Sequence, residues 1–184
     1  MSLPGVRTST TDQGAATLSE GERGFDDLDF RRTMGRFPTG VTVVTMLGPG
    51  ERPYGVTVNA FMSVSLEPPL VAVSLGQAAR AHPTLAASER FAVSVLAEDQ
   101  RALSDRFAGR RAPTGDDPFV PFHGFPVIEG AVAHVLCRMH SSFEAGDHTI
   151  FVGEVEALRT SPGAPLVFHS GRYGALASEP DNRS

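Results

Sequence analysis

Between residues 40 and 176, short runs rich in Val, Ile, Phe and Thr alternate with segments that contain Gly and Pro. Runs of this kind are typical of β-strands. The segments between them that have helical character, at 79–88 and 98–109, are short. A regular βαβ protein would need a helix after almost every strand. The pattern therefore predicts a mainly β protein, a predominantly antiparallel barrel with a few short helices packed against it.

Pro and Gly mark the ends of the expected strands, because neither is favoured inside a central strand. The second run of strand residues is long and is expected to break near Asn59. The Pro, Gly and aromatic residues crowded into 110–126 predict a loop. Strands are expected at 40–46, 54–66, 67–76, 90–97, 131–144, 148–158 and 165–169, with a tail segment at 170–176.

The two ends of the chain differ from its middle. Residues 1–24 contain almost no large apolar side chains and are expected to be a disordered tail, as are residues 179–184. The domain is expected to span 25–178. It should open with a helix capped by Asp26 or Asp27, in which Phe30, Met34 and Phe37 lie on one face. The simplest interpretation is that this face packs into the core, and a place beside a cofactor is the second interpretation.

Composition narrows the classes of function. The net charge is −5 and the chain has no lysine, so a general nucleic-acid-binding role is not expected. No run is long and apolar enough to cross a bilayer, and the N-terminal residues lack an apolar signal segment. The single Cys137 cannot form an internal disulfide. A cytoplasmic protein without a membrane partner is therefore expected.

The familiar catalytic motifs are missing. His134, Cys137 and His140 lie on one expected strand, where alternation points the cysteine away from the two histidines, so no metal site is predicted. The histidines are expected on a polar or interfacial face and the cysteine in the core. Phosphate loops of the Walker type, GxGxxG turns and GxSxG elbows are also absent from the sequence.

Three separated stretches carry the remaining signal: "RFPTGVTVVT" at 36–45, "YGVTVNAFMSVSLEPPLVAVSL" at 54–75, and "GDHTIFVGEV" at 146–155. In this order and spacing the chain resembles the flavin reductase family of FMN-binding split-barrel proteins. The resemblance implies a Greek-key-like antiparallel split barrel, a homodimer, and transfer of reducing equivalents from NADH or NADPH to FMN or FAD. It also implies a flavin-dependent monooxygenase as the partner that receives the reduced flavin.

The same resemblance implies where cofactors bind. Flavin contacts are expected at Thr39, Gly40, Val41, Thr57, Val58, Asn59, Ala60 and Phe61, and further cofactor contacts at Leu75 and Phe91. Ser74, Arg80, Ser88 and Arg90 flank the expected short helix and are expected to donate to the flavin phosphate, with simple surface solvation as the alternative for Arg80 and Arg90. The nicotinamide is expected beside Gly146, Asp147 and His148, with Arg172 and Tyr173 approaching the same pocket.

His148 is the expected catalytic residue, and its role would be to position the nicotinamide, since the cofactors carry the redox chemistry themselves. Two other functions stay open at this point. One is a split-barrel protein that binds a flavin or another cofactor without turnover. The other is a flavin oxidase that acts on a small substrate. A histidine at a strand end can also be a simple polar turn residue.

Overall fold

The computed structural model describes residues 24–110 and 117–177. The expected tails, apart from Gly24, and part of the expected loop at 110–126 lie outside the described residues. The chain divides into two compact units, residues 1–34 and 35–184. Within the described residues, no helix is long and apolar enough to cross a membrane.

The described part of the first unit is helix α2, Asp27–Met34. Asp26 caps it as expected: its Oδ1 accepts a hydrogen bond from the backbone N–H of Asp29 at 2.7 Å, and Asp29 Oδ2 accepts one from the Asp26 N–H at 3.5 Å. The expectation that its apolar face joins the core is wrong, because no residue of α2 is buried. A helix of eight residues has too few side chains to enclose a core of its own.

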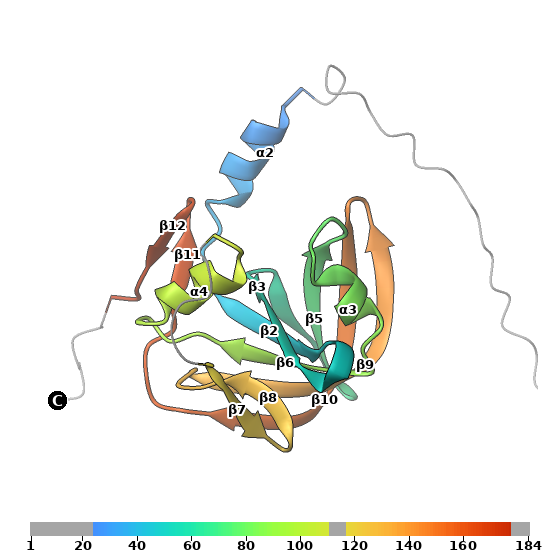
Figure 1. Cartoon of the computed structure of the whole chain (residues 1–184). Helices are drawn as coiled ribbons and strands as arrows, with labels where there is room; N and C mark the ends of the chain where they lie inside the picture. The colour runs from blue at the N-terminus through green and yellow to red at the C-terminus, as the bar shows by residue number, and fades with distance from the viewer. Residues whose placement is uncertain (1–23, 111–116, 178–184) are drawn as a thin grey trace, which may run out of the picture. The chain divides into compact units, whose positions relative to one another are not determined.

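The second unit holds the sheet strands and two further helices (Figure 1). Its elements in chain order are β1 Thr39–Gly40, β2 Thr42–Leu47, the 3-10 turn Pro49–Glu51, β3 Pro53–Val58, β4 Phe61–Leu66, β5 Pro69–Gly76, α3 His82–Ala86, β6 Arg90–Val95, α4 Arg101–Phe107, β7 Phe119–Phe122, β8 Phe125–Ile128, β9 Ala133–Ala145, β10 His148–Thr160, β11 Val167–His169 and β12 Arg172–Gly174. The expected mainly β fold and the break of the second run near Asn59 are confirmed.

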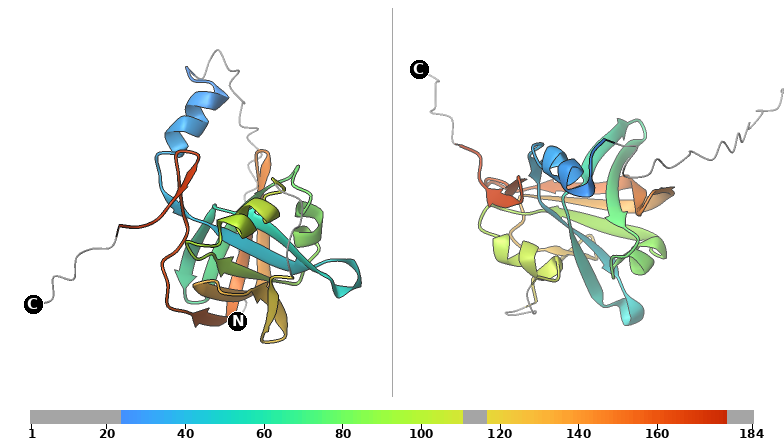
Figure 2. Two further views of the ribbon diagram at one scale, coloured as in Figure 1. Left: turned by 60° about the vertical axis from the view of Figure 1, so that its left-hand side comes forward. Right: turned by 90° about the horizontal axis from the view of Figure 1, so that it is seen from above.

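Seven strands form one antiparallel sheet in the order β3-β2-β6-β9-β10-β5-β4. The edge strands β3 and β4 are consecutive in the chain, and only Asn59 and Ala60 join them. The Cα atoms of Val58 and Phe61 are therefore at most about 11 Å apart. Two opposite edges can be joined by so short a link only if the sheet curls round until they meet at one corner. This is the geometry of a barrel split along one seam (Figures 1 and 2).

Three apolar clusters fill the unit. The largest occupies the concave side of the sheet, where Val44, Val73, Phe91 and Phe151 are buried and Leu85 of α3 packs among them. The second lies beneath α4 and the β11–β12 hairpin, and the third beneath the β7–β8 hairpin. Strands β2 and β6 are therefore covered on both faces, which explains their nearly continuous apolar sequences.

The expected loop at 110–126 contains most of the β7–β8 hairpin, so that prediction is wrong for residues 119–126. His123 and Gly124 form its two-residue turn, both with positive φ, at 49° and 74°. Such turns suit the twist of a hairpin. The strands have only four residues each, and a proline in each, Pro121 paired with Pro126, masks the β pattern.

His134 is fully buried rather than on a polar face. Its Nε2–H donates to the carbonyl oxygen of Ile128 at 2.8 Å, and its Nδ1 faces Arg159 at 3.4 Å. Burial and the neighbouring arginine lower its pKa, although the hydrogen bond to Ile128 acts in the opposite direction. Cys137 is in the core as expected, and burial raises the pKa of its thiol to about 12, so it is protonated and unreactive.

Candidate functional site

Hydrogen bonds to the backbone carbonyls of Val58 and Ala60 hold the link between β3 and β4 in place. Thr42 Oγ1 donates to the carbonyl oxygen of Val58 at 2.6 Å, and the N–H of Ser74 donates to the carbonyl oxygen of Ala60 at 3.0 Å. The side chain of Val58 is buried, whereas Asn59 is exposed. The seam of the barrel therefore presents the amide of Asn59 on a rigid corner.

Thr57 was expected to contact the flavin, but its hydroxyl proton is used within the protein. Its hydroxyl donates to the carbonyl oxygen of Ser104 on α4 at 2.8 Å. The proton of this hydroxyl is therefore used to join α4 to β3, and only the lone pairs of the oxygen are left for a ligand.

A pocket of about 250 Å³ lies at this corner. It is lined by Phe37, Pro38, Thr39, Gly40, Thr42, Asn59, Phe61 and Val95. The aromatic and backbone surfaces suit a flat apolar ring, and Asn59 supplies both a donor and an acceptor. Thr39 Oγ1 is buried and has no hydrogen-bond partner among the described residues. A buried hydroxyl without a partner at a pocket wall fits a site that is completed by a polar group of a ligand.

Gly146, Asp147 and His148 form the tip of the β9–β10 hairpin. Ala145 pairs directly with His148, so Gly146 and Asp147 are the two turn residues, and Gly146 has a φ of 62°. A residue with a Cβ would be strained there. The carbonyl oxygen of Asp147 accepts a hydrogen bond from the N–H of Gln77 at 2.9 Å, which ties the tip to the end of β5.

The imidazole of His148 is about half exposed and lies over Gly76, its strand partner. A Cβ at Gly76 would stand 3.6 Å from His148 Nε2, so the glycine leaves room for the ring. Nδ1–H of the neutral ring donates to Asp147 Oδ1 at 2.8 Å. That hydrogen bond sets the tautomer and leaves Nε2 as an acceptor in neutral His148.

Strand β5 brings the hairpin tip and the Asn59 corner together. Ser74 holds the carbonyl of Ala60, and Gly76, two residues further along β5, faces His148. Two strand residues span about 7 Å. Leu75 between them is buried in the core and supports the strand rather than a ligand.

The C-terminal hairpin adjoins the same pocket. Thr39 of β1 pairs with Phe168 of β11, which pairs with Tyr173 of β12, so the three form one row across the small sheet. Val41, just after β1, is buried in the cluster beneath this hairpin. The hydroxyl of Tyr173 donates to Asp105 Oδ1 at 3.0 Å and lies 2.9 Å from Ser104 Oγ. Its ring is half-buried, while Arg172 is exposed.

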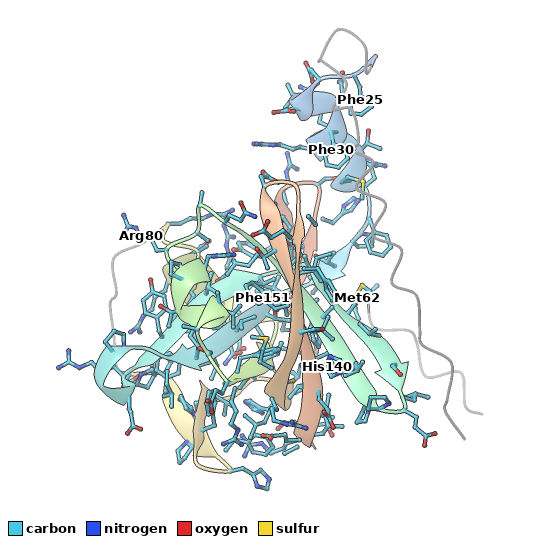
Figure 3. The ribbon with its side chains drawn as sticks, turned by 90° about the vertical axis from the view of Figure 1, so that its right-hand side faces the viewer. Phe25, Phe30, Met62, Arg80, His140 and Phe151 are labelled. Carbon is cyan, nitrogen blue, oxygen red and sulfur yellow. The ribbon has the colours of Figure 1, made fainter. Side chains whose placement is uncertain are left out.

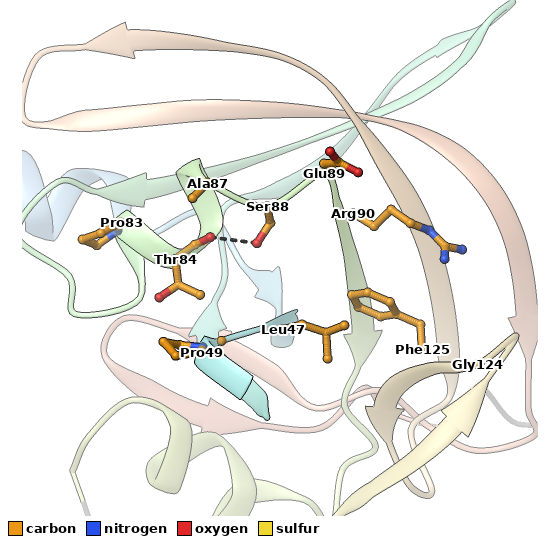
Figure 4. A pocket seen from close by; sticks show the side chains of 11 residues that line it. Leu47, Pro49, Pro83, Thr84, Ala87, Ser88, Glu89, Arg90, Gly124 and Phe125 are labelled. Atoms are coloured by element: carbon orange, nitrogen blue, oxygen red, sulfur yellow. Dashed lines mark hydrogen bonds between the residues drawn. The ribbon is translucent and has the colours of Figure 1, made fainter. Parts of the chain in front are cut away.

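Three of the expected cofactor contacts, Ser88, Arg90 and Phe91, do not line the corner pocket. Val95, at one end of β6, lines the pocket at the corner, and Arg90, at the other end, lines a separate pocket of about 650 Å³ with Ser88 (Figure 4). Five residues of strand separate Arg90 from Val95 by about 17 Å. Phe91, also on β6, has its side chain fully buried in the core.

Ser88 and Arg90 also have partners of their own. Ser88 donates to the carbonyl oxygen of Thr84 at 2.7 Å, and Arg90 pairs with Glu156 at 2.8 Å. Arg80 is exposed in the segment between β5 and α3, four residues after Gly76 (Figure 3). Among the arginines expected near the flavin phosphate, Arg80 is therefore the one whose place in the fold agrees with that role.

The sequence matches the family described as flavin reductase like domain over residues 34–177.

This chain belongs to the flavin reductase family.

Among its relatives, it is 44% identical to the NADH-dependent FAD reductase of Streptomyces globisporus over 85% of this chain and 89% of the relative. It is 43% identical to the FMN reductase (NADH) SmoA of Agrobacterium fabrum over 85% of this chain and 90% of that protein. The fold is similar to that of the styrene monooxygenase flavin reductase of Pseudomonas putida S12, with a TM-score of 0.77 and 36% identity, over 83% of this chain and 99% of that structure.

Several residues of the corner pocket and the hairpin tip were not expected from the sequence. Pro38, Thr42 and Val95 line the pocket, and Gly76 makes room for His148. Phe37 also lines the pocket, and it lay on the helix face for which a place beside a cofactor was the second interpretation. Phe37 and Pro38 directly precede the expected "TG" contact, so their proximity in the chain was the available signal. Gly76 and Val95 carry no such signal, because strand pairing alone brings them to the site.

Proposed function

We propose that this protein is an NADH-dependent flavin reductase that transfers a hydride to FMN or FAD and supplies the reduced flavin to a separate monooxygenase. The observation that carries the proposal is the packing of the Gly146–His148 hairpin tip on the end of β5, beside the Asn59 corner, in a chain of the flavin reductase family. The two relatives named above use NADH with FAD and with FMN. The reductase domain is proposed to span residues 25–178.

The corner pocket is proposed to hold the flavin ring. Asn59 would pair with the polar edge of the ring, Thr39 Oγ1 would gain the partner that it lacks, and Phe61 and Phe37 would border the ring faces. Gly40 lines this wall, the N–H of Ser74 holds the carbonyl of Ala60, and the hydroxyl of Thr57 joins α4 to the strand that ends at the corner. Arg80 is proposed to meet the flavin phosphate. The flavin itself accepts the hydride when it is bound.

His148 is proposed to position the nicotinamide. With Nδ1–H held by Asp147, neutral His148 offers Nε2 as an acceptor for the N–H of a carboxamide. No residue of the chain needs to donate or remove a proton at carbon in a hydride transfer. The protein therefore contributes alignment of the two rings, for which a rigid hairpin tip is well suited.

We also propose that the protein is a homodimer that joins through the outer face of β4, β5, β10 and β9. On β4, Met62 and Val64 are 61% and 47% exposed, and Phe143 of β9 is 59% exposed. Met62 lies in the same row as Ala72 and Val152, and Phe143 in the next row, with Ile150 and Ser74. Figure 3 shows Met62 on this face.

This face differs from the outer face of β2 and β6, which α4 and the β7–β8 hairpin cover. Within residues 35–110 and 117–177, Met62, Val64 and Phe143 stay exposed on this face, whereas Ala72 and Val152 beside them are buried. A second copy is the occupant that fits, because the face is apolar and continues to Ser74, beside the Asn59 corner, so that both subunits would border the flavin. A cytoplasmic location is proposed with it, since the reduced flavin must reach a partner enzyme.

The direct test mixes the purified protein anaerobically with FAD or FMN and then with NADH. The proposal predicts that the flavin absorbance near its visible maximum bleaches in the presence of the protein and returns when air is admitted. Flavin that binds but stays yellow in NADH would favour the non-catalytic binding protein. Bleaching by a small organic substrate but not by NADH would favour the oxidase.

A further inference from the structure

A second pocket, of about 490 Å³, lies between α4 and the β12 end of the C-terminal hairpin. Its lining includes three arginines, Arg101 and Arg110 from the α4 region and Arg172 from β12, around Tyr173. The one carboxylate among the lining residues is Asp105, so the described lining carries two positive charges in excess. Such an excess in a concave site favours an anionic ligand.

The arginines line the pocket, and their ion pairs within the protein leave the guanidinium groups exposed to a ligand. Asp105 lies 3.9 Å from Arg101 and 3.6 Å from Arg110, distances at which exposed ion pairs contribute little. The side chains of Arg101 and Arg110 are 68% and 59% exposed, whereas that of Asp105 is 12% exposed. The negative charge is therefore covered and the guanidinium groups face outward. Arg172 makes no ion pair within the described residues.

Tyr173 forms the floor that positions these groups. The guanidinium of Arg101 lies over its ring at 5.0 Å, and its hydroxyl is fixed by Asp105 and Ser104. Tyr173 is therefore a positioning residue, and its hydroxyl is already engaged within the protein. The ring and the guanidinium together provide a flat, cationic surface that suits a phosphate ester.

The arginine pocket shares a wall with the flavin corner. Ser104, which contacts Tyr173, also accepts the hydrogen bond from Thr57, two residues before Asn59. Tyr173 is two strands away from Thr39 across the β1-β11-β12 sheet, a separation of about 10 Å. In a dinucleotide, a sugar or ribityl chain separates the reactive ring from the diphosphate. The two pockets are spaced on that scale.

We infer that Arg101, Arg110 and Arg172 bind the ADP diphosphate of a dinucleotide whose reactive ring lies at the Asn59 corner. This inference rests on the proposed reductase function. NADH and FAD both carry this group, whereas FMN lacks it. Because Arg80 is proposed to meet the phosphate that FMN and FAD share, the arginine pocket is assigned to the diphosphate of NADH, and a diphosphate supplied by FAD is the outcome that the kinetics distinguish from it.

The experiment compares the wild type with the double variant Arg101→Gln/Arg172→Gln and with Arg110→Gln. Arg52→Gln is the matched control, because Arg52 is an exposed arginine on the β2–β3 connection, away from α4. Titration calorimetry with ADP as the probe, on the flavin-loaded protein, should show affinity reduced about tenfold or more in the double variant and unchanged in the control. Thermal melting confirms that each variant is folded.

Kinetics then separate the two sources of the diphosphate. A raised KM for NADH with FMN as the flavin assigns the pocket to NADH. A raised Kd for FAD with an unchanged Kd for FMN assigns it to FAD. Equal ADP affinity in wild type and double variant, or no ADP binding to the wild type, overturns the inference. If the wild type binds ADP but does not oxidise NADH, the proposed reductase function fails while the anion site stands.

Discussion

At the scale of single residues, two glycines set the position of His148. Gly146 takes a left-handed φ that closes the two-residue turn, and Gly76 leaves the space that the imidazole occupies. Asp147 then fixes the ring through Nδ1. The Gly-Asp-His motif therefore divides into a turn residue, an orienting carboxylate and the side chain that is proposed to face the nicotinamide.

Replacing His148 with alanine should spare flavin binding and slow the reduction. The variant removes a positioning contact to the nicotinamide and leaves the corner pocket intact, so kcat/KM for NADH should fall roughly tenfold to a hundredfold. Stopped-flow bleaching of the bound flavin at varied NADH measures it. Wild-type bleaching at every NADH concentration, together with a slightly lowered melting temperature, would mean that His148 is only a strand-end residue.

Gly153 is a glycine for a different reason. A Cβ at this position of β10 would lie 2.5 Å from Cζ of the buried Phe91 and 2.8 Å from Cβ of Cys137. Gly153→Ala should therefore destabilise the fold by about 1–3 kcal/mol through overpacking. Gly174→Ala is the control, because its Cβ would meet nothing within 4 Å. Urea unfolding of both variants measures the difference, and equal midpoints would contradict the packing argument.

At the scale of elements, the β7–β8 hairpin is attached to the sheet by buried polar contacts at Ile128 inside an apolar interface, one to Ser94 of β6 and one to His134 of β9. Phe122, Phe125 and Val127 pack on β6 and β9, while His134 of β9 donates to the carbonyl oxygen of Ile128 at the end of β8. Arg159 of β10 lies over the ring of Phe122 at 4.9 Å and beside the same histidine. Protonation of His134 would place two cations side by side in this interface.

The pH dependence of stability follows from this contact. Burial lowers the pKa of His134 below its ordinary 6.5 in the folded protein, so below pH 6.5 the unfolded chain binds more protons. The free energy of unfolding should fall as the pH drops from 6.5 through the lowered pKa, and this group should add no pH dependence above 6.5. Melting temperatures of wild type and His134→Gln between pH 5 and 8 measure it. Parallel curves would show that His134 does not titrate in this window.

At the scale of the molecule, the seam of the barrel couples fold to function. The short link between the two edge strands creates the corner that presents Asn59, and the β4 edge also carries the apolar rows proposed for the dimer. One curled sheet therefore places a ligand corner beside an apolar face. Closure of the sheet and completion of the site depend on the same strands.

Met62→Glu should weaken the dimer and flavin retention together. A carboxylate on the apolar face would have to lose its hydration without a partner when the copies join. Sedimentation velocity, read at protein and flavin wavelengths, should show a dimer with flavin for the wild type and a monomer with less flavin for the variant. Leu176→Glu, at an exposed leucine after β12, is the control. A wild-type monomer that keeps its flavin would overturn the shared site.

The sequence by itself determined the features that depend on neighbours along the chain. Alternating β-branched residues, the prolines before β5 and the break at Asn59 predicted the strands, and Asp26 predicted its cap. The motifs around Thr39, Asn59 and His148 predicted the family, and the cofactor contacts that they name stay a prediction. These signals are local, because strand propensity, turn chemistry and capping act over a few residues.

Only the tertiary structure decided which predicted residues share a site. Asn59 lines the corner pocket, whereas β6 carries Arg90, whose expected role rested on a weaker match to the family, away from it. His134 was expected on a polar or interfacial face, but the β7–β8 hairpin covers it. Arg172 lies beside Arg101 and Arg110 around Tyr173 only because α4 packs on β12. The physical reason is that strand order and register are set by burial of apolar faces between distant segments, which no single stretch of sequence contains.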